Sequence, residues 1–292
     1  MGTRPLRHYY DRDGDTVPAL HVEPNFADTL VAWKRHRDRF TATLQELPTD
    51  EWDRPTRCAA WSVREVIGHL IVVDGFWAMT FTNARNQAAP TTMLEGFNPS
   101  NSTDAMVAAT TELEISALLA QFVDGTDALA QVVDGFGTEH WEARCESPIG
   151  HLPATCNFGH AFWDSWLHER DIFEPVGAAP AIVADELAAA TRFSLLFAAL
   201  QGGLVDDPMP AGPGPEGAID VTIAFDDLPD AAIRVQIDRA VRITPASVAG
   251  AMPAGRAIDV AEGLTGRRPL TGALDSLPAD LGAQLGRAAL VL

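Results

Sequence analysis

The sequence has little positive charge. Of its 292 residues, 21 are Lys or Arg and 40 are Asp or Glu, which gives a formal charge of −19, and Lys34 is the single lysine. Non-specific binding to DNA or RNA depends on clustered Lys and Arg side chains, so this composition argues against a nucleic-acid partner. The same acidity disfavours docking on an anionic membrane surface.

Cysteines and long apolar runs are also scarce. Cys58, Cys145 and Cys156 form no Cys-x-x-Cys pair, and an odd, scattered set predicts no disulfide framework. No run approaches the roughly 18 apolar residues of a membrane-spanning helix, and the first five residues lack the apolar stretch of a signal peptide. We therefore expect a soluble, cytoplasmic protein with reduced thiols.

Several common catalytic motifs are missing as well. The chain contains no Gly-x-Ser-x-Gly, no P-loop and no His-Glu-x-x-His. Residues 212–217 fit the letters Gly-x-Gly-x-x-Gly but lie in a proline-rich loop, so they do not predict a dinucleotide site. Any chemistry must therefore come from other residues.

The spacing of apolar residues predicts long helices in the first part of the chain. One stripe has three- and four-residue steps: Phe26, Leu30, Trp33, Phe40, Leu44 and Leu47. A second helix begins at Ser62, where Ser62 and Glu65 have the spacing of a capping box. We expect a third helix over about 104–133 and a fourth over about 155–173. Four helices of this length indicate a four-helix bundle.

The second part of the chain has a different pattern of apolar residues. A helix is expected over about 183–204, and period-two alternation predicts strands near 219–225, 233–237 and 241–243. Helices broken by Gly263 and Gly266 are expected over 257–292. The predicted fold class is α+β, with a tail over 1–22 that straps the surface, a helical bundle over 23–178 and a small α+β domain over 179–292.

Histidines inside the predicted amphipathic helices are the candidate functional residues. Asp164 and His168 are four residues apart, so they share a helix face and can chelate one ion. His160 lies eight residues from His168, about 12 Å along the axis, too far to share that ion unaided. A third ligand must come from another helix, and His69 borders the apolar stripe of the second one.

Plainer interpretations of these residues remain open. An Asp/His pair at this spacing also forms simple intrahelical hydrogen bonds, and a single histidine such as His69 is often a core residue. Cys156 is most simply a small buried hydrophobe. His8, His21 and His36 are expected to face solvent.

The same residues resemble a known family. The first motif comprises Trp52, Thr56, Cys58, Trp61, Ser62 and Val63, followed by His69 and Leu70. It resembles the mycothiol-dependent maleylpyruvate isomerase family, which belongs to the DinB-like metal-binding bundles. The segment from Asp164 through His168 to Ile172 resembles that family's second motif, and residues 264–272 resemble its C-terminal domain, which is similar to sterol-carrier proteins.

The resemblance implies a site and its cofactors. It implies metal ligation by His69, Asp164 and His168, with Asp164 at a position where the isomerases carry Glu. Zn²⁺ suits these ligands, while nickel, iron and manganese remain open. His160 would line the pocket, and Glu169 or a backbone carbonyl would hold the second nitrogen of a liganding imidazole. Arg267 or Arg268 would bind a carboxylate of substrate or cofactor, or else remain solvated loop residues.

The resemblance also implies a reaction. The expected cosubstrate is mycothiol, the low-molecular-weight thiol of actinobacteria, and a metal-bound thiol is a thiolate at neutral pH. That nucleophile would add to a small-molecule electrophile and either isomerise it or remain on it as an S-transfer product. Two alternatives stay open: a small-molecule binding protein, and a metal-binding stress or regulatory protein without turnover. A monomer and a homodimer are both compatible with the sequence.

Overall fold

The computed structural model describes residues 6–11, 21–108, 110, 112–201, 219–238, 240–269 and 282. The helices are α1 (Leu30–Gln45), α2 (Val63–Arg85), α3 (Pro99–Val107), α4 (Ile115–Asp134), α5 (Thr138–Glu142), α6 (Ala154–Phe173), α7 (Ala184–Gln201) and α8 (Ala257–Gly263). The strands are β1 (Arg144–Ser147), β2 (Gly150–Pro153), β3 (Ile219–Ala224), β4 (Ala232–Ile237), β5 (Val241–Ala246) and β6 (Met252–Pro253). Short 3-10 turns cover Ala27–Thr29, Thr49–Glu51 and Glu174–Val176. Within these ranges, no helix has both the length and the apolarity to cross a membrane.

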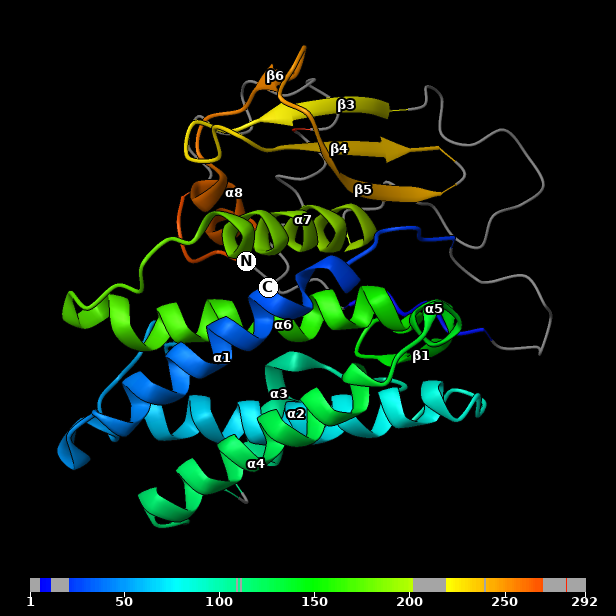
Figure 1. Ribbon diagram of the computed structural model, residues 1–292. Coiled ribbons are helices and arrows are strands. Elements are labelled where there is room, and N and C mark those ends of the chain that lie inside the picture. The colour runs from blue at the N-terminus through cyan, green and yellow to red at the C-terminus, as the bar shows by residue number, and fades with distance from the viewer. Residues whose placement is uncertain are drawn as a thin grey trace.

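The helices α1, α2, α4 and α6 pack as a bundle (Figure 1). The predicted capping box begins α2: the backbone N–H and the hydroxyl of Ser62 both donate to Glu65 Oε2 at 2.7 Å. The helix α6 is buried on nearly every face, because α1 and α2 pack on it from the bundle and α7 packs on it from the opposite direction. It is the central helix of the molecule, and both α2 and α6 carry the candidate site.

The second sheet has the strand order β5-β4-β3-β6. The first three strands pair antiparallel, and β6 pairs parallel to β3. Alternate residues such as Ile223, Val235 and Ile243 are buried, which is the pattern of a sheet with one covered face. The helix α7 lies between this sheet and the bundle (Figure 1). The α+β prediction is confirmed, and the predicted domain boundary at 178 falls in the loop before α7.

The described part of the N-terminal segment packs on both parts of the molecule. The backbone of Tyr9 exchanges hydrogen bonds with Ile149 and His151 beside the β1–β2 hairpin, and its hydroxyl donates to the Leu200 carbonyl on α7 at 2.6 Å. Farther along, Val22 forms a parallel bridge with Val241 on β5. These contacts fit the predicted strap, of which residues 1–5 and 12–20 lie outside the described residues.

The predicted helix over 104–133 is wrong, because two helices occupy this region. The Thr110 hydroxyl donates to the Val107 carbonyl at the end of α3, and Glu114 has an extended backbone where α4 begins. Thr110 also packs on Gly68 of α2 so closely that a β-carbon there would lie 2.0 Å from its hydroxyl oxygen. The helix is therefore interrupted at the point where the chain packs against α2.

Two further differences concern local environment. No strand was predicted after Arg144, where the chain forms a hairpin with Ser147 paired to Gly150 at its tip. His36 does not face solvent: it is fully buried, and its Nε2 atom lies 2.9 Å from the Ser165 hydroxyl on α6. The end of the chain that was expected to be helical after α8 lies mostly outside the described residues.

Candidate metal centre and pocket

Three side chains converge between α2 and α6. His69 lies on α2, and Asp164 and His168 lie one turn apart on α6. The His69 Nε2 atom is 3.3 Å from Asp164 Oδ2, and the His168 Nε2 atom is 3.4 Å from Asp164 Oδ1. One donor atom from each residue lies within 4.8 Å of the other two. The structure thus brings together the three predicted ligands, and their binding of an ion stays a prediction.

The electrostatics of this group favour a cation. Burial alone would raise the pKa of Asp164, but the neighbouring His168 and His69 outweigh it and hold the pKa well below the usual 3.8. Burial opposes the charge of His168, yet Asp164 and the nearby Cys58 and Asp171 raise its pKa well above 6.5. The anionic carboxylate therefore favours the protonated form of His168, and a divalent cation would displace that proton, because His binds metals as the neutral ring.

The second nitrogen of His168 faces a different acid. His168 Nδ1 lies 3.0 Å from Asp171 Oδ2, so Asp171 fixes the orientation of the ring. The expectation that Glu169 holds such an imidazole is wrong for His168. Glu169 instead accepts hydrogen bonds from Arg39 and lies 3.3 Å from His36 Nδ1.

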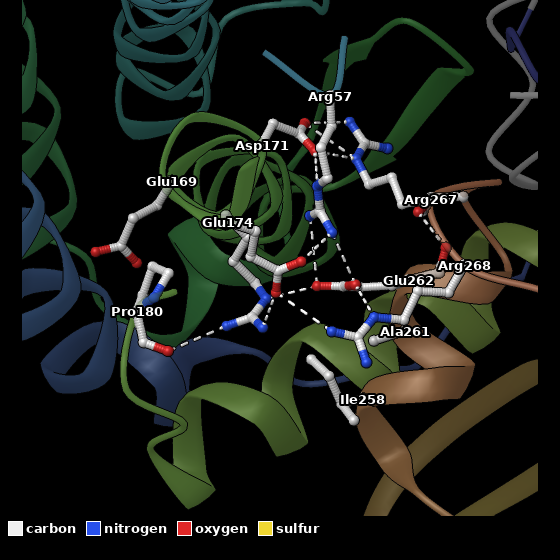
Figure 2. Close-up of polar contacts among 12 residues, drawn as sticks. Arg57, Glu169, Asp171, Glu174, Pro180, Ile258, Ala261, Glu262, Arg267 and Arg268 are labelled. Atoms are coloured by element: carbon white, nitrogen blue, oxygen red, sulfur yellow. Dashed lines mark hydrogen bonds and ion pairs between the residues drawn. The ribbon is translucent and has the colours of Figure 1, made fainter. Parts of the chain in front are cut away.

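Asp171 is itself held by two arginines (Figure 2). Arg57 Nε donates to Asp171 Oδ1 at 3.0 Å. Arg267 forms a forked contact, with Nε at 2.8 Å from Oδ1 and Nη2 at 2.7 Å from Oδ2. Burial would raise the pKa of Asp171, but His168 and Arg267 hold it far below 3.8. This carboxylate remains ionised, and its position is set by His168 on the same helix and by arginines from two other parts of the chain.

The two arginines predicted as carboxylate binders are both engaged within the protein. Arg267 lines the pocket, but its guanidinium forms an ion pair with Asp171. Arg268 lies away from the pocket and contacts Glu262 at 2.5 Å, Asp259 at 3.3 Å and Glu174 at 3.3 Å. Their assignment to a substrate or cofactor carboxylate stays a prediction, and the contacts give both residues a structural role.

Cys58 is a site residue that the sequence reasoning did not select. Its Sγ atom donates to Asp171 Oδ2 at 3.2 Å and lies 3.6 Å from His168 Nδ1. The signal was available, because Cys58 lies within the first motif, three residues before Trp61. What the sequence did not show is that the loop before α2 turns back onto α6, where the Arg57 N–H bonds the Asp171 carbonyl.

Two groups of potential ligands therefore share His168. The first is His69, Asp164 and His168, and the second is Cys58, His168 and Asp171. The oxygens of Asp171 already accept hydrogen bonds from Arg57 and Arg267, which would oppose a cation, whereas Asp164 contacts the two imidazoles. Two nitrogens and one carboxylate oxygen are also a typical zinc donor set. The first group is the better fit to a metal ion.

The first group lies in a pocket of about 710 Å³. Trp61 covers the metal-ligand end, with its ring centroid 5.1 Å from that of His69. His160 also lines the pocket, stacked on Phe193 at 5.0 Å and beside Trp77 at 5.2 Å. Burial lowers the pKa of His160 to about 4, so this imidazole is neutral at pH 7. Its Nδ1 atom has no hydrogen-bond partner among the described residues.

Comparisons with known proteins found a matching family model and similar solved structures. Residues 33–173 match the family model described as the mycothiol maleylpyruvate isomerase N-terminal domain. The fold is similar to the crystal structure of the mycothiol-dependent maleylpyruvate isomerase, at 13% identity and a TM-score of 0.56, covering 85% of this chain and 91% of that one. A variant of that enzyme with one histidine replaced by alanine matches equally, at 12% identity, with the same TM-score and coverage. No curated protein matches the chain in sequence.

Proposed function

We propose, because residues 33–173 match the family model described as the mycothiol maleylpyruvate isomerase N-terminal domain, that this chain is a metal- and mycothiol-dependent enzyme that acts on a small electrophile. The observation that carries the proposal is the convergence of His69, Asp164 and His168 at one end of a pocket large enough for a substrate. Pockets of several hundred cubic ångströms are typical of small-molecule sites.

The residues have separate tasks in this proposal. His69, Asp164 and His168 would hold the ion, for which Zn²⁺ is the best match. When bound, such an ion supplies thiolate stabilisation at neutral pH, because a coordinated thiol loses its proton. Asp171, fixed by Arg57 and Arg267, keeps Nε2 of His168 directed at Asp164. Trp61 shields the polar end of the pocket from water.

The proposed reaction is cis–trans isomerisation. The thiolate sulfur bonds to an alkene carbon conjugated to a carbonyl group, and the displaced electron pair moves to the carbonyl oxygen. After rotation about the new single bond, the carbon–sulfur bond breaks and the thiolate returns, so no net proton or electron is consumed. If the adduct is instead protonated at carbon, or if another group leaves, the product is a thioether and the enzyme is an S-transferase.

The test combines elemental analysis with a thiol-dependent assay. The purified chain is expected to carry a stoichiometric divalent metal and to isomerise dimethyl maleate only when mycothiol is present, as followed by NMR. The variant His69→Ala should lose both metal and activity. The matched control His21→Ala removes an exposed histidine that contacts Glu23, and it should retain both.

The outcomes separate the rival functions. Activity without bound metal would contradict the metal assignment. Bound metal without thiol-dependent turnover would instead favour a metal-binding stress or regulatory protein, and specific ligand binding without metal would favour a small-molecule carrier.

A further inference from the structure

The pocket has a polar end and an apolar end. His69 contacts Asp164 at 3.3 Å, and Trp77, eight residues farther along α2, lies beside His160, four residues earlier on α6. The two helices are therefore antiparallel, and the ends of the pocket are about 12 Å apart along α2. The metal-ligand group occupies one end, and aromatic rings occupy the other.

Apolar side chains from many parts of the chain line this pocket. The helix α2 contributes Val73 and Phe76, α7 contributes Phe197, and the loop between α2 and α3 contributes Leu94 and Phe97. The hairpin and the N-terminal segment close it with Ile149 and Leu6. Burying an apolar ligand against such a surface removes both from water and stabilises the complex. Each methylene group that is buried raises the affinity about fourfold.

Charge in the pocket disfavours an anionic ligand. Among the described residues, Arg267 is the one Lys or Arg that lines it, and its guanidinium is paired with Asp171 (Figure 2). Asp104 and Asp164 also line the pocket, and the chain carries a formal charge of −19. The proposed metal ion would pair with one carboxylate, but a dicarboxylate has a second, and burying that one without a cationic partner is costly.

We propose, on the basis of the function proposed above, that the electrophile of this site is an uncharged molecule with an alkyl or aromatic body rather than a dicarboxylate such as maleylpyruvate. Its reactive carbon lies toward His69 and His168, and its apolar body lies among Phe76, Phe97 and Phe197. His160 also lines the pocket and places one imidazole ring among these apolar side chains.

Binding of unreactive probes tests this assignment independently of turnover. Succinate, diethyl succinate and dibutyl succinate share one carbon skeleton but differ in charge and apolar length, and none carries an alkene. Titration of the purified full chain by tryptophan fluorescence is informative because Trp61, Trp77 and Trp163 line the pocket. We expect dibutyl succinate to bind at least tenfold more tightly than diethyl succinate, and succinate to bind most weakly.

A matched pair of variants places the ligand. Phe97→Ala removes a half-buried ring that lines the pocket and should weaken dibutyl succinate binding by about tenfold. Met93→Ala removes an exposed side chain of the same loop that is not part of the lining, and it should leave the affinity unchanged.

Each result decides one of the two proposals. Succinate binding as tightly as the diesters, affinity independent of chain length, or an unchanged affinity in Phe97→Ala would overturn the uncharged-substrate assignment. If the diesters bind as expected but dibutyl maleate is not isomerised with mycothiol, the proposed function is wrong and the assignment of the pocket to uncharged ligands stands.

Discussion

His168 uses its two ring nitrogens for different purposes. Nε2 faces Asp164, which contacts no arginine among the described residues, and Nδ1 faces Asp171, which is held by two arginines. A carboxylate whose charge is already balanced by two arginines can orient a ring, but it is a poor partner for a further cation. This division predicts on which side of the imidazole a metal ion binds, and it gives Cys58, on the Nδ1 side, a positioning role.

Two conservative substitutions distinguish the sides. Asp164→Asn removes an anionic ligand and should weaken zinc affinity by at least about 100-fold, which is the upper range for changes to groups that only support a ligand. Cys58→Ser should change zinc affinity by less than about tenfold, because its Sγ atom contacts His168 through Nδ1. Competition with a chelating dye measures both affinities. Loss of zinc from Cys58→Ser with retention in Asp164→Asn would place the ion among Cys58, His168 and Asp171.

At the scale of the element, the start of α2 sets the position of His69. The capping box satisfies free N–H groups of the first turn through Ser62 and Glu65. Ser62→Ala should lower the free energy of unfolding by about 1 kcal/mol, as measured by urea denaturation. The control Ser116→Ala changes an exposed serine in the first turn of α4, where Glu114 is the N-cap residue, and it should have almost no effect. Equal losses in the two variants would show that the box contributes nothing specific.

Elements that follow from local spacing were predictable, and those that follow from distant contacts were not. Period 3.6 predicted α1, α2 and α6, and period two predicted β3 to β5, because one-sided burial leaves a pattern within the element. The break at Thr110 depends on its fit against Gly68 of another helix. Burial of His36 was concealed by its polarity, although it lies between Trp33 and Phe40 on the same stripe.

The site shows the same limit. The spacing of Asp164 and His168 predicted their shared face, and only the family resemblance connected them to His69. The roles of Asp171, Arg267 and Arg268 depend on contacts between distant parts of the chain, with 96 residues separating Arg267 from Asp171. No local pattern records which of several acids an arginine will meet.

At the scale of the whole molecule, Glu262 joins the C-terminal part to the bundle. Its fully buried carboxylate, on α8, accepts hydrogen bonds from Arg57 and Arg268 (Figure 2) and also from Arg170. Arg57 also holds Asp171, so one guanidinium links this junction to the candidate metal centre. The position of the C-terminal part and the orientation of His168 are therefore physically connected. A change at the junction should alter the orientation of His168 in the pocket.

Glu262→Gln tests the junction through its pH dependence. Burial alone would raise the pKa of Glu262, but hydrogen bonds from Arg57 and Arg170 outweigh it and lower the pKa below the usual 4.5. A lowered pKa in the folded state stabilises the protein above pH 4.5, and this stabilisation disappears as the pH falls below that value. Removing the charge leaves buried arginines without their partner, so the variant should lose about 3 kcal/mol at pH 7.

Urea unfolding of both proteins at several pH values between 7 and 3.5 measures this effect. We expect the difference in stability to be largest and constant above about pH 5.5 and to shrink as the pH falls through 4.5. Asp220→Asn is the matched control, because it removes an acid from an exposed ion pair with Arg234 on the sheet, and exposed pairs contribute little. A pH-independent loss in Glu262→Gln would mean that packing, rather than the buried charge, joins the two parts, and the connection to His168 through Arg57 would then have no electrostatic basis.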